Sequence, residues 1–193
     1  MAREHLHALS TGLRAPGRRT VRPDSPPAGL DAMVNQFTGP AFVLDHRRDV
    51  LAWNTLGARL ITDFGALPAP DRNMVWLMLT DPKLGRLYPD WETGARTQVG
   101  MLRRASDLHP DDARIRELVA RLRTGSEEFV RWWPLREVRE KTAGTKTLIH
   151  PSLGRITLPF QVWRPVATTD VEMLVYYATD ASTARVFREL AEL

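Results

Sequence analysis

The chain has 193 residues, of which 43% are hydrophobic and 26% charged, as in a folded domain rather than a disordered chain. It contains no cysteine, which excludes disulfide bonds, cysteine-ligated zinc, iron–sulfur clusters and a cysteine nucleophile. The net charge is +4, but residues 1–25 hold five arginines against two acidic residues, so the rest of the chain is nearly neutral and does not favour a nucleic-acid-binding surface.

Residues 1–28 are predicted to lie outside the folded domain. Leu6, Leu9 and Leu13 repeat at helical spacing and indicate a weak helix, and a linker rich in proline and arginine follows it. The N-terminus carries charge and histidine where a signal peptide has its apolar stretch, and the apolar runs of the chain are too short to span a membrane. These features predict a cytoplasmic protein.

A hairpin followed by a capped helix is the most informative local pattern. A short helix is predicted for residues 30–37, and apolar runs at 41–44 and 50–53 then flank the polar segment DHRRD. Asp45 and Asp49 supply turn-forming side chains, and Asn54 stands at an N-cap position before the next helix. This order of elements is typical of the start of a PAS-type sensor domain.

The middle of the chain is predicted to be a block of helices separated by Asp-Pro, Pro-Asp and His-Pro-Asp-Asp breaks. Proline fits the first turn of a helix and aspartate caps it, so each break ends one helix and starts another. We expect a short helix ending near Thr80, a second beginning at Pro82 and a third from Trp91 to about Leu108. A fourth helix carries Ile115, Leu118, Val119 and Leu122 on its apolar face. A fifth begins after Ser126 and carries Phe129, Trp132 and Trp133.

The final third of the chain changes to strand-forming residues. KTLIHP, GRITLPFQVW and VEMLVYYAT are rich in β-branched and aromatic residues and predict three strands, with a tight turn at 152–154 between the first two. A helix over 182–193 ends the chain. Five strands interrupted by helices are combined most simply in one antiparallel sheet with helices covering a face of it, which is an α+β fold.

Several separate motifs resemble one family. PAFVLDHRRDVLAWN, LTDPKLGRLYPDWE, the HPDD helix, GTKTLIHPSLGRITLPFQVW and LVYYATDAST are, in this order, similar to the MmyB-like ligand-binding domain of XRE-type bacterial transcription regulators. The resemblance implies a PAS-like domain over residues 29–193, with an apolar cavity for a fatty-acid-like molecule. Residues 1–28 resemble only the last helix of a helix-turn-helix domain and its linker. DNA binding is therefore expected only through a helix-turn-helix domain missing here, and homodimerisation is expected because such regulators read two half-sites.

The residues expected to contact such a ligand are mostly large apolar side chains, which wall binding pockets in general. Arg96 and His150 are the candidate polar anchors, although a solvated helix arginine and a hairpin histidine are the simpler interpretations, and Asn54 is also a natural helix cap. The predicted set is Phe42, Leu44, Trp53, Asn54, Trp76, Leu77, Trp91, Arg96, Val99, Phe129, Trp132, His150, Phe160 and Tyr177.

Metal and enzyme chemistry find little support in the sequence. The five histidines are scattered, with no HExxH motif or triad at ligand spacing, and no nucleotide-binding or nucleophile motif is present. We therefore expect no catalytic residue, no metal and no cofactor other than a bound fatty acid or similar lipid. The alternative to a ligand sensor is a PAS-like dimerisation or protein-interaction module with a solid core and no ligand.

Overall fold

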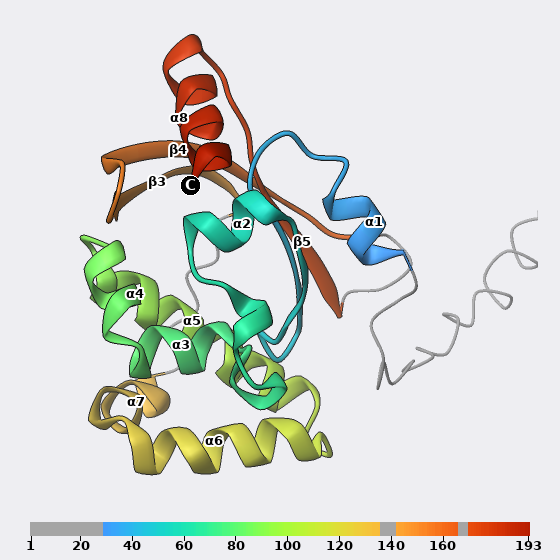
Figure 1. The fold of residues 1–193 in the computed structure, drawn as a ribbon. Helices are drawn as coiled ribbons and strands as arrows, with labels where there is room; N and C mark the ends of the chain where they lie inside the picture. The colour runs from blue at the N-terminus through green and yellow to red at the C-terminus, as the bar shows by residue number, and fades with distance from the viewer. Residues whose placement is uncertain (1–28, 136–141, 166–169) are drawn as a thin grey trace, which may run out of the picture.

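The computed structural model describes residues 29–135, 142–165 and 170–193, so the predictions for residues 1–28 lie outside the described residues. Five strands form one antiparallel sheet in the order β2-β1-β5-β4-β3 (Figure 1). The strands are β1 (Ala41–Asp45), β2 (Val50–Trp53), β3 (Ala143–His150), β4 (Gly154–Trp163) and β5 (Val171–Tyr176). The predicted PAS-like α+β fold is confirmed.

Eight α-helices accompany the sheet within the described residues. They are α1 (Leu30–Val34), α2 (Thr55–Leu60), α3 (Met74–Thr80), α4 (Pro82–Leu87), α5 (Trp91–Leu108), α6 (Ala113–Gly125), α7 (Glu127–Trp132) and α8 (Ala181–Glu192). Three of the predicted caps form: Asp81 accepts from the Lys83 amide, Asp112 from Ile115 and Ser126 from Phe129. At the Pro-Asp break α5 begins as predicted, but the side chain of Asp90 makes no cap hydrogen bond. Side-chain caps satisfy amides that have no partner at a helix start, which is why these polar residues set the helix boundaries.

Neighbouring residues of β1 point to opposite faces of the sheet. Phe42 and Leu44 belong to the main hydrophobic core, which lies between the sheet and helices α2, α3 and α4. Ala41 and Val43 belong to a separate cluster on the other face, where they pack with Val34 of α1. We expected the helices to cover one face, but α1 packs on the second face, because the side chains of β1 and β5 are buried or half-buried on both sides of the sheet.

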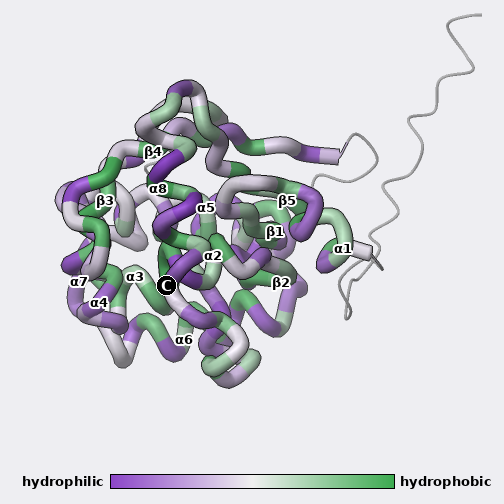
Figure 2. The backbone as a smooth tube through the Cα atoms, turned by 45° about the horizontal axis from the view of Figure 1, so that its top comes forward, coloured by the Kyte–Doolittle hydropathy of each residue, from purple (hydrophilic) through white to green (hydrophobic). Residues whose placement is uncertain are grey.

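The helical block has a core of its own. Helices α5, α6 and α7 bury a cluster of apolar side chains against one another, and in Figure 1 α6 and α7 form the layer farthest from the sheet. The apolar residues of α5 therefore face the outer helices, and in Figure 2 the apolar stretches run through the inside of the molecule. The buried members of this cluster are Val75, Val99, Leu102, Ala105, Ile115, Leu118, Leu122, Phe129 and Trp133.

Asn54 connects three parts of the fold. Its Oδ1 atom accepts hydrogen bonds from the amides of Gly57 (2.8 Å) and Ala41 (3.1 Å), so it caps α2 and binds the start of β1. Its Nδ2 atom donates to the carbonyls of Gly39 (2.8 Å) and Val34 (3.2 Å). Helix α1 ends at Val34, rather than at residue 37 as predicted, and the carbonyl of this last helical residue is bonded to Asn54.

Replacing Asn54 by alanine should lower the free energy of unfolding by about 2–4 kcal/mol. The substitution removes the α2 cap and leaves several buried backbone groups without a partner. Urea denaturation followed by circular dichroism measures the loss, with Thr55→Ala at the neighbouring exposed position as the control. A loss below about 1 kcal/mol would contradict the role assigned to this side chain.

Candidate functional site

A cavity of about 460 Å³ lies between the sheet and the helical block. Its floor is formed by inward-facing residues of all five strands, and its roof by α3, the α4–α5 junction and one side of α5. The volume is within the range of about 300–1,000 Å³ that small-molecule sites occupy. The exposed residues Pro89, Asp90 and Thr93 are part of the lining, so the cavity reaches the surface beside the start of α5.

One part of the cavity wall is apolar and rich in aromatic rings. Phe42 makes edge contacts with Phe64 and Tyr176, at ring-centroid distances of 5.8 and 6.4 Å. Tyr176 also lies 6.2 Å from Phe160. The remaining apolar lining consists of Leu44, Val50, Ile61, Met74, Met78, Met101, Val162 and Leu174. Methionine side chains adapt to irregular shapes, which suits a flexible apolar ligand.

Charged groups line a different part of the same cavity. The guanidinium of Arg48 forms a close ion pair with Glu172, and its Nε atom donates to Gln98 Oε1 at 2.9 Å. The guanidinium of Arg164 donates to the second oxygen of Glu172 at 2.8 Å. Burial raises the pKa of Glu172, but the two arginines outweigh it and hold that pKa below its usual range. Glu172 is therefore an ionised carboxylate whose charge is compensated by the two arginines.

Lys146 is the cation of the lining that keeps its charge available. Its Nζ atom lies 5.0 Å from the ring centre of Phe160, and among the described residues it makes no ion pair or hydrogen bond. Burial lowers the pKa of Lys146 to about 8, helped by the charge of Arg48 and opposed by Glu172. A half-buried ammonium that makes no ion pair with any described residue favours an anion as its partner.

Two tyrosine hydroxyls add neutral polar groups to the wall. Tyr88 and Tyr176 both line the cavity. Burial raises the pKa of both phenols above the usual value, so both stay protonated and can donate. The cavity thus offers apolar walls, an Arg48–Glu172–Arg164 cluster, two protonated phenols and the ammonium of Lys146, which has no ion-pair partner among the described residues.

Three of the residues predicted from the sequence line this cavity: Phe42, Leu44 and Phe160. Tyr177 does not, because it is exposed and its neighbour Tyr176 takes the inward position of β5. Leu77 is buried in the main core without lining the cavity, while Val99 and Phe129 belong to the separate core of the outer helices.

The polar anchors proposed from the sequence have other partners. Arg96 does not line the cavity and instead forms an i,i+4 ion pair on α5, in which its Nη1 atom lies 3.5 Å from Glu92 Oε1. His150 is buried at the end of β3, where its Nε2 atom is bonded to the carbonyl of Arg59 at 3.0 Å and its Nδ1 atom accepts from two turn amides. It is the satisfied hairpin histidine of the simpler interpretation. Asn54 acts as the cap described above.

The predicted tryptophans lie around the cavity rather than in its wall. Trp53 packs against the ring of Phe64, and the guanidinium of Arg72 lies over its indole. The guanidinium carbon of Arg121 lies 4.1 Å from the ring centre of Trp76. Trp91 and Trp132 contact each other at a centroid distance of 5.8 Å. These contacts stabilise the helical block and its outer surface.

The sequence did contain a signal for the residues that were missed. Strand residues alternate between the two faces, so a charge in the same register as core residues points inward. Lys146 shares its register with Leu148, Arg164 with Val162, and Glu172 with Leu174. Charged residues at inward positions of β3 and β5 and directly after β4 indicate a polar region on this face of the sheet.

A second group of side chains gathers at another place. His46 follows β1, His109 caps α5 and Asp170 precedes β5, and one potential ligand atom from each lies within 4.8 Å of the other two. These histidines are 63 residues apart in the sequence, which therefore did not predict a cluster. The fold brings two of them together because the β1–β2 turn meets the α5–α6 turn.

Comparisons with known proteins identify one family. A family model described as the MmyB-like transcription regulator ligand binding domain matches residues 26–190. No curated protein matches the chain. Among the described helices, none combines the length and the apolar character needed to cross a bilayer.

Proposed function

We propose that this chain, which belongs to the MmyB-like transcription regulator ligand binding domain family, binds an elongated apolar molecule with an anionic head group, such as a fatty acid. The observation that carries the proposal is the combination of a largely apolar cavity with the ammonium of Lys146, which has no ion-pair partner in the described part of the chain. Burial of an acyl chain contributes about 0.8 kcal/mol per methylene, and one contact to the carboxylate then orients it.

Extraction of the purified protein under denaturing conditions, followed by lipid mass spectrometry, tests this function. We expect a stoichiometric fatty acid or similar lipid, or, from protein stripped of lipid, saturable binding of dodecanoate in calorimetry. Protein that is recovered empty and does not bind dodecanoate would contradict the proposal. That result would favour the alternative of a dimerisation or interaction module without a ligand.

The proposed output of binding is a change at α1. Phe42 and Leu44 contact the cavity, while Ala41 and Val43 between and beside them pack with α1 on the opposite face. A ligand that shifts β1 therefore acts on α1, and through it on the segment that connects to a DNA-binding helix-turn-helix domain in XRE-type regulators. Such a shift requires that the ligand bind one arrangement of α1 better than another.

Hydrogen exchange measured with and without dodecanoate should show a change at residues 30–37 as well as at the cavity. The exchange of α6, which belongs to the separate helical core, should stay nearly unchanged and provides the internal control. Protection confined to cavity residues, with α1 unaffected at saturating dodecanoate, would contradict signalling through this helix.

We also propose that the regulator acts in the bacterial cytoplasm as a homodimer. Support comes from the family, since regulators that read two half-sites commonly place two copies on the DNA. Light scattering of the purified chain measures the mass directly, and a monomer at high micromolar concentration would contradict dimerisation by this domain alone.

A further inference from the structure

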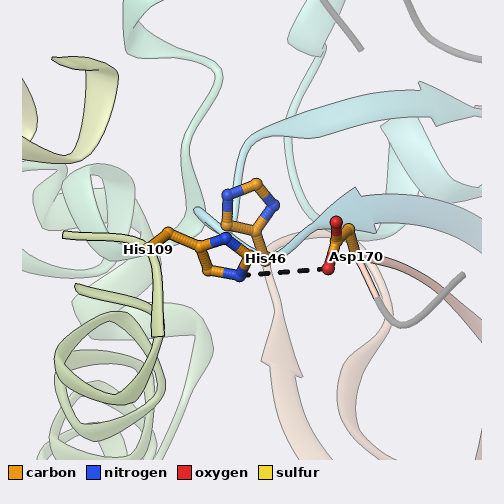
Figure 3. Close-up of side chains that lie close together, drawn as sticks. All are labelled: His46, His109 and Asp170. Carbon is orange, nitrogen blue, oxygen red and sulfur yellow. Dashed lines mark ion pairs between the residues drawn. The ribbon is translucent and has the colours of Figure 1, made fainter. Parts of the chain in front are cut away.

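We propose that His46, His109 and Asp170 form a binding site for a divalent transition-metal ion of the zinc type. Figure 3 shows the two imidazoles one above the other, with the Asp170 carboxylate beside them. The ring centroids are 4.2 Å apart, and His109 Nε2 lies 3.9 Å from Asp170 Oδ1. The three potential ligand atoms lie within 4.8 Å of one another.

A neighbouring carboxylate orients His46 as a ligand. Asp112 Oδ2 lies 3.1 Å from His46 Nε2 and also accepts a hydrogen bond from Arg47 Nε at 2.7 Å. An ionised carboxylate only accepts, so Nε2 carries the proton of the neutral ring and Nδ1 keeps its lone pair. Metal-bound histidines usually donate their second ring nitrogen to a carboxylate in this way.

The Nδ1 atom of His46 is the unexplained group that points to a ligand. It is buried and has no hydrogen-bond partner in the described part of the chain. A buried polar atom without a partner is costly, and native structures contain few of them. Because Asp112 occupies Nε2, Nδ1 is the nitrogen of His46 that a metal ion would use.

The ligand set indicates which ions fit. Two imidazoles and one carboxylate are typical of sites for zinc, cobalt or nickel, and three protein ligands leave a coordination position for water. Ligands about 2.0–2.1 Å from a tetrahedral ion are about 3.3 Å apart, so small side-chain rotations from the present separations suffice.

The site would tie the helical block to the sheet. His46 belongs to the β1–β2 turn, His109 to the junction of α5 and α6, and Asp170 to the start of β5. The backbone already brings two of them together, since the His46 amide donates to the Asp170 carbonyl at 2.9 Å. Metal binding should therefore stabilise the folded state against separation of these elements.

Isothermal titration of EDTA-treated, untagged protein with zinc chloride tests the site. We expect one zinc ion per chain, and a melting temperature higher by about 5–10 °C at a free zinc concentration 100 times the dissociation constant. Cobalt in place of zinc should give an absorption spectrum of a nitrogen- and oxygen-ligated ion. His46→Gln and His109→Gln should each weaken zinc binding at least tenfold, and the double variant should abolish it.

Two further variants distinguish this site from zinc bound elsewhere on the chain. Exchange of His5 and His7 for glutamine controls for zinc bound at the N-terminal histidines and should leave the affinity unchanged. Asp112→Asn should weaken zinc binding about 10- to 100-fold while the cobalt spectrum is retained, as expected of a positioning residue. Failure of wild-type protein to bind zinc at micromolar concentrations, or undiminished binding by the His46→Gln/His109→Gln variant, would overturn the proposal.

Discussion

Replacing Lys146 by methionine should weaken dodecanoate binding at least tenfold and at the same time stabilise the unliganded protein. The ammonium has no ion-pair partner among the described residues, and burial already disfavours its charge. Methionine keeps a similar length and apolar stem, so the cavity retains its shape while the contact to the carboxylate is lost. The gain in unfolding free energy should be about 1–3 kcal/mol.

The pH dependence gives this prediction a second signature. The pKa of Lys146 is about 8 in the folded protein and lies below its ordinary value of 10.5, so the folded state disfavours the proton. The cost to stability is fully present below pH 8 and disappears as the pH rises from about 8 to 10.5. Dodecanoate affinity should fall over the same window, as Lys146 loses its charge.

Calorimetric titration and thermal unfolding at pH 7 and pH 9.5 measure both effects. Lys83→Met is the matched control, because Lys83 is exposed on α4 and does not line the cavity. If the Lys146→Met variant binds dodecanoate as tightly as the wild type, the carboxylate does not lie at this lysine. A loss of stability in the unliganded variant would contradict the inference that the charge of Lys146 destabilises the empty protein.

Replacing Val162 by tryptophan should reduce dodecanoate binding by about 100-fold or more. Val162 lies opposite Leu174 on the neighbouring strand, and both side chains line the cavity. An indole at this position occupies the space of several ligand methylenes, each worth about 0.8 kcal/mol, so displacing four of them accounts for the effect. The fold should persist, because the larger side chain enters an existing cavity rather than a packed core.

Gln161→Trp is the matched control for this substitution. Gln161 is the preceding residue of β4, is exposed and points to the other face of the sheet. Both variants should give the circular dichroism of the wild type, and only Val162→Trp should lose binding in calorimetry. Equal dodecanoate affinity for Val162→Trp and wild type would place the ligand outside this cavity.

Local patterns predicted the elements of this fold well, because caps and alternation are short-range signals. Asn54, Asp81 and Ser126 each cap the helix that the sequence assigned to them. The packing partners of α5 were harder to predict. Its apolar face, with Val99, contacts the outer helices, whereas Thr97 and Gln98 on its more polar side line the cavity. Periodicity identifies the faces of a helix but not which neighbour each face meets.

The cavity lining was also predicted only in part, because local patterns do not show which elements meet. Phe42 and Phe160 could be assigned from apolar strand positions, but the cation of the cavity could not be chosen without knowing the strand order. The grouping of His46 with His109 depends on the meeting of two turns that are distant in the sequence. Long-range contacts of this kind leave no periodic trace in a single sequence.

The strict alternation of β1 and β5 separates two properties within the same strands. Even-numbered positions such as Phe42 and Leu174 line the cavity, while odd-numbered positions such as Val43 and Val175 form the surface on which α1 packs. On the proposed function, ligand selectivity and the response of α1 should therefore change independently, each by substitution of alternate residues in the same strands.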